Sequence, residues 1–334
     1  ISEDAAIASE RGEALLHLAG VINRQGRVED HNTVSDLDPE EQRRGISINL
    51  SVLPFDWQGT KINLLDVPGY LDFLGEARSA LRVSDGVVLV VDAVSGVEVG
   101  TELMWEEADA RGLPRLILVN KMDRDNARFR RAVDSLTTTF SDAKIVPIHL
   151  PIGEGEQFDG FVNLVTRQAF DRTGQPRDIP ENLADEVEEA ALELMESAAE
   201  GDDELIMKYL DGEELTSDEV WHGLKAMVAN GSMVPVLVGS AVTGTGMAAL
   251  ANAIVGLLPS PEGRDEEAMR GDQAVELSHE PGGPLAAFIF KTVVDPYGST
   301  SIFRVFSGTM RGDQRVHNQR GEEERVGPIF VLRG

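Results

Sequence analysis

The chain has 334 residues, which favours two or three domains, and its 42% hydrophobic content is ample for packed cores. Its formal net charge of −28 argues against a protein that coats nucleic acid without sequence preference, because phosphate binding needs clustered Lys and Arg. Docking on a nucleoprotein through a local patch stays open. Cysteine is absent, which excludes disulfides and thiolate chemistry, and there is neither an apolar run of about 18 residues nor a secretory signal, so we expect a cytoplasmic protein without membrane contact.

The first half of the chain alternates helical segments with apolar, strand-like runs. A helical segment at 13–20 ends at Gly20, and the polar stretch 21–45 that follows is too long for an ordinary connection. Two runs at 46–55 and 60–67, joined by a DWQG turn, predict a hairpin. The next predicted elements are a helix at 71–83, a strand at 85–94, a helix at 100–112, a strand at 114–123, a helix at 126–140 and a strand at 143–153. This alternation is typical of an α/β fold with a parallel sheet covered on both faces.

The second half begins with acidic helices and ends in short strands. Residues 181–219 carry much of the negative charge, which is typical of a solvent-exposed helix face. A buried strand is predicted at the start of 233–246, and a helix then runs to Leu258. Residues 258–273 are predicted to be a linker, and the short strands from 284 onward indicate the beginning of a β-barrel that the chain ends too early to close.

The stretch Asp66-Val67-Pro68-Gly69 follows the second hairpin strand directly. In doubly wound sheets, ligands bind at the carboxyl ends of the strands. At such a place the carboxylate of Asp66 can hold a Mg²⁺-bound water, and the backbone N–H of Gly69 can reach a γ-phosphate. A DxxG motif alone is common, however, and is more simply explained as a strand end.

A second motif, Asn120-Lys121-Met122-Asp123, follows the apolar run at 114–119 and has more specific chemistry. A carboxylate at Asp123 can accept hydrogen bonds from both the N1–H and the 2-amino group of guanine, a donor pair that adenine lacks. The stem of Lys121 can lie over the base, and Asn120 can link neighbouring loops. This motif therefore indicates a preference for guanine.

Two further pieces complete the set. Gly239-Ser240-Ala241 follows the strand at 233–238, where a backbone N–H could meet guanine O6. Ser47, after the long polar loop, could supply a hydroxyl to Mg²⁺ and its N–H to a γ-phosphate. The motifs DVPG, NKMD and GSA occur in this order, and each directly follows an apolar strand. Together they predict a guanine-nucleotide site, although a single one of them would be weak evidence.

The ordered set RRGISI, DVPGYLDF, NKMD and GSA closely resembles the translational GTPases, and within them elongation factor G and its paralogues. Residues 79–124 support the resemblance, and residues 151–165 resemble the start of an insertion that elongation factor G carries within its GTPase domain. Residues 284–316 resemble the opening of its second, β-barrel domain. The resemblance extends from about Glu13 to Gly334.

The resemblance implies a P-loop-NTPase-like α/β GTPase domain over 1–260, with a mostly parallel sheet and a helical or α+β insertion at about 151–232. It also implies a linker at 261–283 and the incomplete N-terminal part of a β-barrel domain at 284–334. The implied ligands are GTP or GDP with Mg²⁺. The implied partner of this monomer is the ribosome, with its RNA and proteins.

The resemblance also assigns roles to single residues. Ser47 would hold Mg²⁺ directly and Asp66 would hold it through a water, while Gly69 and Tyr70 would act in hydrolysis. The remaining nucleotide contacts would come from Pro68, Gly69, Asn120, Lys121, Asp123, Ser240 and Ala241. GTP binding would order residues 30–48 and reposition 66–83.

One feature of the family is missing. A Gly-rich GxxxxGKS/T loop should precede the helix at 13–20, because its backbone N–H groups and lysine surround the phosphates. Residues 1–12 contain no lysine, no Gly-rich turn and no apolar strand. A natural loss of the loop, a fragment, a misjoined reading frame and an omitted segment are all compatible with this sequence. As printed, the chain is expected to bind GTP weakly or not at all.

Two single-residue departures bear on hydrolysis. Tyr70 stands where the family usually places histidine, and a phenol can donate or accept one hydrogen bond but cannot carry the positive charge of an imidazolium. Ser47 replaces the usual threonine and keeps the hydroxyl. Two hypotheses follow: a GTPase coupled to ribosomal translocation, or a weakly binding or hydrolysis-deficient paralogue or fragment that serves as a ribosome- or partner-binding module.

Overall fold

The structure, a computed structural model, describes residues 6–26, 30, 32–35, 38–44, 46–263, 266–270, 273–295 and 298–331. The chain divides into two compact units, one that reaches Leu258 and one from Pro259 to Arg333. The first unit is α/β and the second consists of strands, which confirms the predicted fold class. None of the helices in the described part of the chain is long and apolar enough to cross a membrane.

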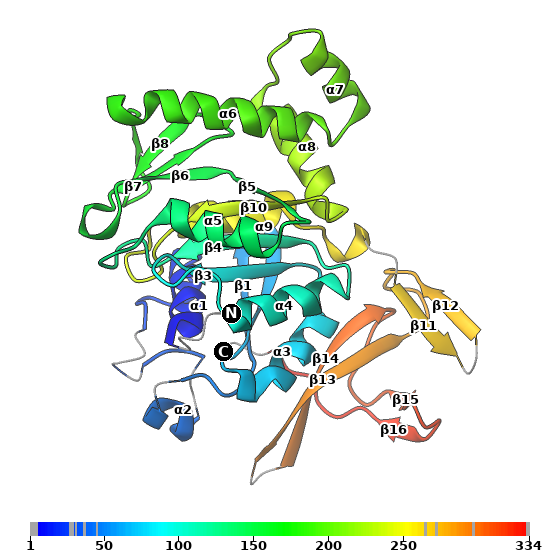
Figure 1. The fold of residues 1–334 in the computed structure, drawn as a ribbon. Helices are drawn as coiled ribbons and strands as arrows, with labels where there is room; N and C mark the ends of the chain where they lie inside the picture. The colour runs from blue at the N-terminus through cyan, green and yellow to red at the C-terminus, as the bar shows by residue number, and fades with distance from the viewer. Residues whose placement is uncertain are drawn as a thin grey trace. The chain divides into compact units, whose positions relative to one another are not determined.

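A four-stranded parallel sheet forms the centre of the first unit (Figure 1). Its strands stand in the order β3 (Val87–Asp92), β4 (Arg115–Asn120), β10 (Met233–Val238) and β5 (Lys144–Pro147). Both β4 and β10 are buried along their whole length, as their unbroken apolar sequences predict for strands covered on both faces. Because the strands are parallel, Asp92, Asn120 and Val238 lie at one edge of the sheet.

Helices connect these strands and pack on the sheet. Helix α5 shows the reason: Phe129, Ala132 and Leu136 recur at helical spacing and are buried, while the residues between them are mostly polar. The helices of the sheet region are α1 (Ala6–Leu18), α3 (Leu74–Arg82), α4 (Val99–Asp109), α5 (Phe129–Thr139) and α9 (Met247–Leu257). Short 3₁₀ turns lie at Leu71–Phe73, Gly155–Gln157, Glu181–Leu183 and Pro261–Gly263. The buried hydrophobic cluster runs from Ala14 to Leu257, so this unit has a core of its own.

The predicted hairpin is formed by β1 (Ser51–Trp57) and β2 (Thr60–Asp66), which make a two-stranded sheet of their own. The turn residues Gln58 and Gly59 have φ angles of 49° and 78°, the positive pair that a two-residue hairpin turn requires. The ladder ends where Ser51 pairs with Asp66. Residues 46–50, which we predicted as strand, lie before the ladder, and the long loop contains a short helix, α2 (Pro39–Arg44).

The apolar run at 143–153 does not form one strand as predicted. Strand β5 ends at Pro147, and after Ile148 the chain enters β6 (His149–Ile152), which belongs to a separate antiparallel sheet. Ile145, Val146, Leu150 and Ile152 are all buried, so the apolar pattern continues through the change of partner strands. Hydropathy therefore could not show where one strand ends and the next begins.

The antiparallel sheet and the helices after it fill the chain between β5 and β10. The sheet has the order β6-β7-β8-β9, with β7 at Gly160–Asn163, β8 at Gln168–Asp171 and β9 at Pro176–Arg177. The helices are α6 (Ala184–Ala199), α7 (Asp203–Leu210) and α8 (Ser217–Ala229). Helix α6 buries Val187, Ala191 and Leu194 and exposes Glu189 and Glu193, so this acidic stretch is a solvated helix face.

The second unit consists of antiparallel hairpins. They pair β11 (Glu266–Arg270) with β12 (Gln273–Leu277), β13 (Ala286–Asp295) with β14 (Gly298–Ser307), and β15 (Arg315–His317) with β16 (Glu323–Arg325). The first hairpin lies within the stretch that we predicted to be a linker, because its charged residues hide the strand alternation. No closed barrel is present among the residues that the structure describes in this unit.

Candidate functional site

The loops that follow β4 and β10 lie side by side at the carboxyl edge of the sheet. Val119 and Val238 are paired in register, and the N–H of Gly239 donates to the carbonyl oxygen of Val119 at 3.0 Å. The side-chain Oδ1 of Asn120, which is almost fully buried, accepts a hydrogen bond from the N–H of Ala241 at 3.0 Å. We call residues 120–123 and 239–241 the β4/β10 corner. The fold thus brings all the predicted guanine-binding residues together.

Lys121 is held in an unusual conformation by a buried carboxylate. Its φ of 62° is left-handed, and its side chain is 4% exposed. Its Nζ lies 2.6 Å from Oδ2 of Asp92, the last residue of β3, while Oδ1 of Asp92 accepts the N–H of Val94 at 2.7 Å. A strained backbone and a buried ion pair persist only where the surroundings enforce them, so the place of Lys121 is strongly determined.

Asp123 has an acceptor that the described chain does not satisfy. Its Oδ1 is buried and has no hydrogen-bond partner among the described residues. An unmet buried acceptor costs about 1–3 kcal/mol, and more when it is charged. A ligand that brings an N–H donor into the corner would remove this cost, and guanine offers two adjacent donors.

The backbone donors of the Ser240-Ala241 turn are already engaged. The N–H of Ser240 donates to the carbonyl of Thr245 at 2.9 Å, and the N–H of Ala241 donates to Asn120. The carbonyl of Ala241 in turn accepts from Nε2 of Gln25 at 3.0 Å. Contact between guanine O6 and the Ala241 N–H, which the sequence suggests, therefore requires Asn120 to release that donor.

The DVPG stretch begins at the end of β2, which belongs to a different sheet from β4 and β10. Asp66 ends β2, and Pro68 and Gly69 are buried in the turn that follows. Tyr70 is 38% exposed at the start of the 3₁₀ turn, and the N–H of Phe73 donates to its carbonyl oxygen at 3.0 Å. The predicted hydrolytic pair is thus a buried glycine beside an accessible phenol.

Ser47 lies at the same end of the hairpin as Asp66. It is 5% exposed and precedes by a few residues the Ser51–Asp66 pair that ends the ladder. The next two backbone N–H groups, of Ile48 and Asn49, both donate at 2.8 Å to Oε1 of Glu41. The loop residues 27–29, 31, 36–37 and 45 lie outside the described residues, including Gly45 of RRGISI.

The N-terminal stretch expected to hold a phosphate loop is helical where it is described. Helix α1 begins at Ala6, and residues 1–5 lie outside the described residues. A Cβ placed on Gly12 would lie 4.0 Å from Oδ2 of Asp66, so this part of α1 is close to the end of β2. Nη1 of Arg11 is buried with no hydrogen-bond partner in the described chain. Burial lowers the pKa of Arg11, against the attraction of the Asp66 and Glu10 carboxylates.

The family model for the Elongation factor Tu GTP binding domain matches residues 10–260. The chain belongs to this family of translational GTPases. A crystal structure titled "ttk003000868", from Thermus thermophilus, is similar with a TM-score of 0.83 and 30% sequence identity over 96% of this chain. The chain covers 46% of that protein, and so spans less than half of its length.

The polar groups at the β4/β10 corner have the chemistry to hold a guanine base. At the β4/β10 corner, the unmet oxygen of Asp123 is complementary to the donor edge of guanine. Within the described residues no three His, Asp or Glu side chains gather to hold a metal ion by themselves. Mg²⁺ in nucleotide sites needs only one or two protein ligands besides phosphates and waters, so Ser47 and Asp66 remain a suitable pair.

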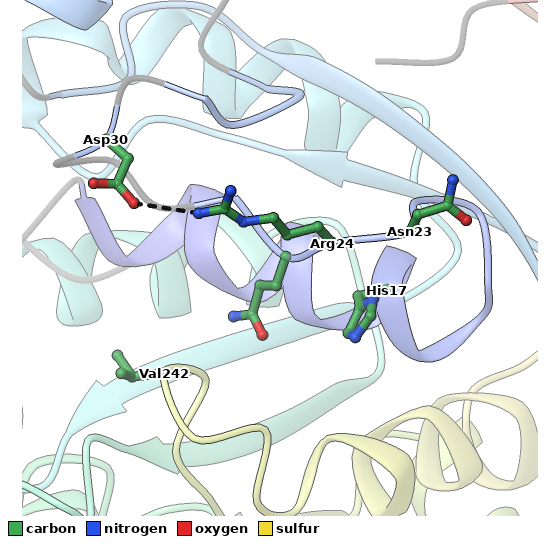
Figure 2. Close-up of a pocket in the computed structure, with 6 residues that line it drawn as sticks. His17, Asn23, Arg24, Asp30 and Val242 are labelled. Carbon is green, nitrogen blue, oxygen red and sulfur yellow. Dashed lines mark ion pairs between the residues drawn. The ribbon is translucent and has the colours of Figure 1, made fainter.

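A cavity of about 490 Å³ opens next to the Ser240-Ala241 turn, where Val242 lines it. Figure 2 shows Val242 on one side of it and His17, Asn23 and Arg24 on the other, with Arg24 directed toward Asp30 at 3.9 Å. Gln25, which also lines the cavity, joins its two sides through the bond to Ala241. The size is within the usual range for ligand pockets.

The motifs did not reveal three residues of the site. Asp92 could have been noticed because, like Asn120, it ends an apolar strand. Gln25 and Arg11 carry no comparable signal, since one lies in a polar loop and the other in a stretch without any recognisable motif. Their places depend on contacts between segments that are far apart in the sequence.

Proposed function

We propose that the protein binds guanine nucleotides at the β4/β10 corner and is an elongation-factor-G-like GTPase whose GTP hydrolysis is coupled to ribosomal translocation. The observation that carries the proposal is the buried oxygen of Asp123, an acceptor left unmet by the described chain beside a fixed lysine and asparagine. The subdomain between β5 and β10 and the sequence resemblance support the finer assignment to elongation factor G. We place the protein in the cytoplasm, as a monomer that binds the RNA and proteins of the ribosome.

Guanine specificity follows from the chemistry of the corner. Asp123 would accept the N1–H and 2-amino donors of guanine, and the stem of Lys121, fixed by Asp92, would cover one face of the base. Adenine would place an acceptor and a C–H against the carboxylate, which leaves a buried charge unpaired. Asn120 accepts the Ala241 N–H at 3.0 Å and would release this donor when guanine O6 takes its place.

The phosphate end of the nucleotide would lie toward the hairpin. The Ser47 hydroxyl and, through a water, the Asp66 carboxylate would hold Mg²⁺, which when bound neutralises phosphate charge. The N–H of Gly69 would donate to the γ-phosphate, and Pro68 restricts the backbone of that turn. Nη1 of Arg11, which has no hydrogen-bond partner among the described residues, provides a donor near Asp66.

Hydrolysis would depend on Tyr70 in the position where the family places an imidazole. The phenol can orient an attacking water through one hydrogen bond but adds no positive charge to the transition state. We therefore expect slow turnover, which replacement of Tyr70 by histidine should accelerate.

A second candidate function is docking on the ribosome without hydrolysis of GTP. The accessible Tyr70, a phenol that cannot carry the positive charge of an imidazolium, favours this alternative. Both candidates use the same fold, and they differ in whether nucleotide turnover accompanies ribosome binding.

Calorimetric titration with GDP, GTP and ADP in Mg²⁺ tests the guanine site. We expect measurable affinity for GDP and none for ADP; equal affinities would contradict the proposal. Ribosome cosedimentation and GTP hydrolysis with and without ribosomes then separate the two candidates. Cosedimentation without stimulated hydrolysis, in both the wild-type protein and Tyr70→His, would favour the second.

A further inference from the structure

We propose that Glu76 is a positioning residue that joins residues 46–50, the Ser47 segment, to helix α3. The inference deepens the proposed function, because Ser47 and the turn before α3 are the two parts expected to respond to the γ-phosphate. The N–H of Leu50 donates to Oε2 of Glu76 at 2.7 Å. The two residues belong to different segments, so this bond fixes the distance between them.

The bond is placed where the β-ladder stops. Ser51 is the first residue of β1 and pairs with Asp66, the last residue of β2, so Leu50 lies just outside the ladder. Its backbone N–H would have to find another acceptor, because Leu50 is itself buried. The half-buried carboxylate of Glu76 provides that acceptor.

Carboxylates thus accept the three backbone N–H groups that follow Ser47. Glu41 accepts the N–H groups of Ile48 and Asn49, and Glu76 accepts that of Leu50. Glu41 belongs to α2 in the same loop, so its hydrogen bonds stabilise the loop internally. Glu76 comes from α3 and therefore links the loop to the other proposed phosphate-responsive segment.

Helix α3 is suited to carry a displacement. It follows Gly69 and Tyr70 after the short 3₁₀ turn, and it buries Ala77, Ala80 and Leu81. Arg78, on the exposed side, binds Glu107 of α4 at 2.6 Å. A movement that begins at Gly69 would shift α3 as a rigid element, and Glu76 would transmit the shift to the Ser47 segment.

Hydrogen exchange in the full chain without nucleotide tests the bond itself. Glu76→Ala should accelerate exchange in the 46–50 peptide at least several-fold, while Glu76→Gln, which keeps an acceptor oxygen, should largely restore protection. Glu106→Ala, an exposed acidic residue of α4, serves as the matched control and should leave this peptide unchanged. Unchanged exchange in Glu76→Ala would overturn the proposal, whatever the nucleotide affinity.

The coupling is tested with GDP and a non-hydrolysable GTP analogue. In the wild-type protein the analogue should protect 46–50 and 66–76 together. In Glu76→Ala it should protect only 66–76, because the bond that joins the two segments is lost. Joint protection in Glu76→Ala would contradict the coupling. If the wild-type protein binds no nucleotide, the proposed function fails, and the nucleotide-free exchange still decides the role of Glu76.

Discussion

At Asp123, replacement of one oxygen by an amide should change which base the protein binds. Asp123→Asn replaces one acceptor oxygen with an NH₂ donor. The 2-amino group of guanine would then face another donor, whereas the 2-oxo group of xanthine would accept a hydrogen bond from the new NH₂ group. We expect GDP affinity to fall by about 100-fold, given about 1–3 kcal/mol for each mismatched buried group, and XDP affinity to rise. Titration of both proteins with GDP and XDP measures this. Equal losses for the two bases would show that Asp123 has only a structural role.

Asp92 should be as important for the corner as the residues that touch the base. Removing one member of a buried ion pair costs about 3–5 kcal/mol, so Asp92→Ala should lower the free energy of unfolding by that order. Asp92→Asn keeps a hydrogen-bond acceptor for Lys121 and should cost clearly less. Urea unfolding measures the difference, and GDP titration of the Asn variant shows whether Lys121 still covers the base. Equal free energies of unfolding for both variants and the wild type would show that the Lys121–Asp92 ion pair does not stabilise the fold.

The predictability of the site differs from residue to residue. Asn120, Lys121 and Asp123 could be predicted because a local motif after an apolar strand has specific chemistry. The strain at Lys121 and its pairing with Asp92 could not, since they arise from the meeting of β3 and β4. Likewise, no local pattern shows that Asn120 already binds the Ala241 N–H, because that bond crosses between two strands that are far apart in the sequence.

At the level of elements, uniformly apolar strands such as β4 and β10 were predictable because burial on both faces leaves one interpretation. The same uniformity concealed the break at Ile148, where the chain leaves the parallel sheet after β5 and enters the antiparallel sheet with β6. The start of β1 was predicted too early for a different reason. Residues 46–50 have the composition of a strand, but the carboxylates of Glu41 and Glu76 take the N–H groups that a strand partner would have taken.

Strand β6 contains a histidine that should make the fold sensitive to acid. His149 is buried against Phe161, with ring centroids 4.5 Å apart, and burial lowers its pKa to about 3. The unfolded chain, with a pKa near 6.5, binds the proton first, so stability should fall as the pH drops from about 6.5 toward 3. Between pH 7.5 and 5 the loss should be about 2 kcal/mol.

His149→Phe should remove this dependence because phenylalanine binds no proton. Its ring still stacks on Phe161, and Nδ1, which has no hydrogen-bond partner among the described residues, is lost. Urea unfolding at pH 7.5 and 5 compares it with wild type and with the exposed-site control His317→Phe. A pH of 5 also avoids the titration of Glu219. A hydrogen bond from Lys208 lowers the pKa of Glu219 to about 2, so its contribution to stability is lost only below about pH 4.5. An equal pH dependence in all three proteins would show that His149 is not responsible.

For the whole molecule, the net charge of −28 predicts that salt stabilises the fold. Mutual repulsion among acidic side chains disfavours a compact chain, and much of that charge lies on exposed faces such as that of α6, where ions screen it. Raising NaCl from about 0.01 to 0.3 M shortens the Debye length from about 30 Å to below 8 Å, so the melting temperature should rise and then level off. Sucrose at matched osmolality separates screening from exclusion effects, and Glu189→Gln/Glu193→Gln on α6 should reduce the response to salt. Salt weakens surface ion pairs such as Lys144–Glu200, but exposed pairs contribute only about 0–1 kcal/mol each. A melting temperature that falls with salt would therefore contradict the prediction, because it would mean that attraction rather than repulsion dominates the surface.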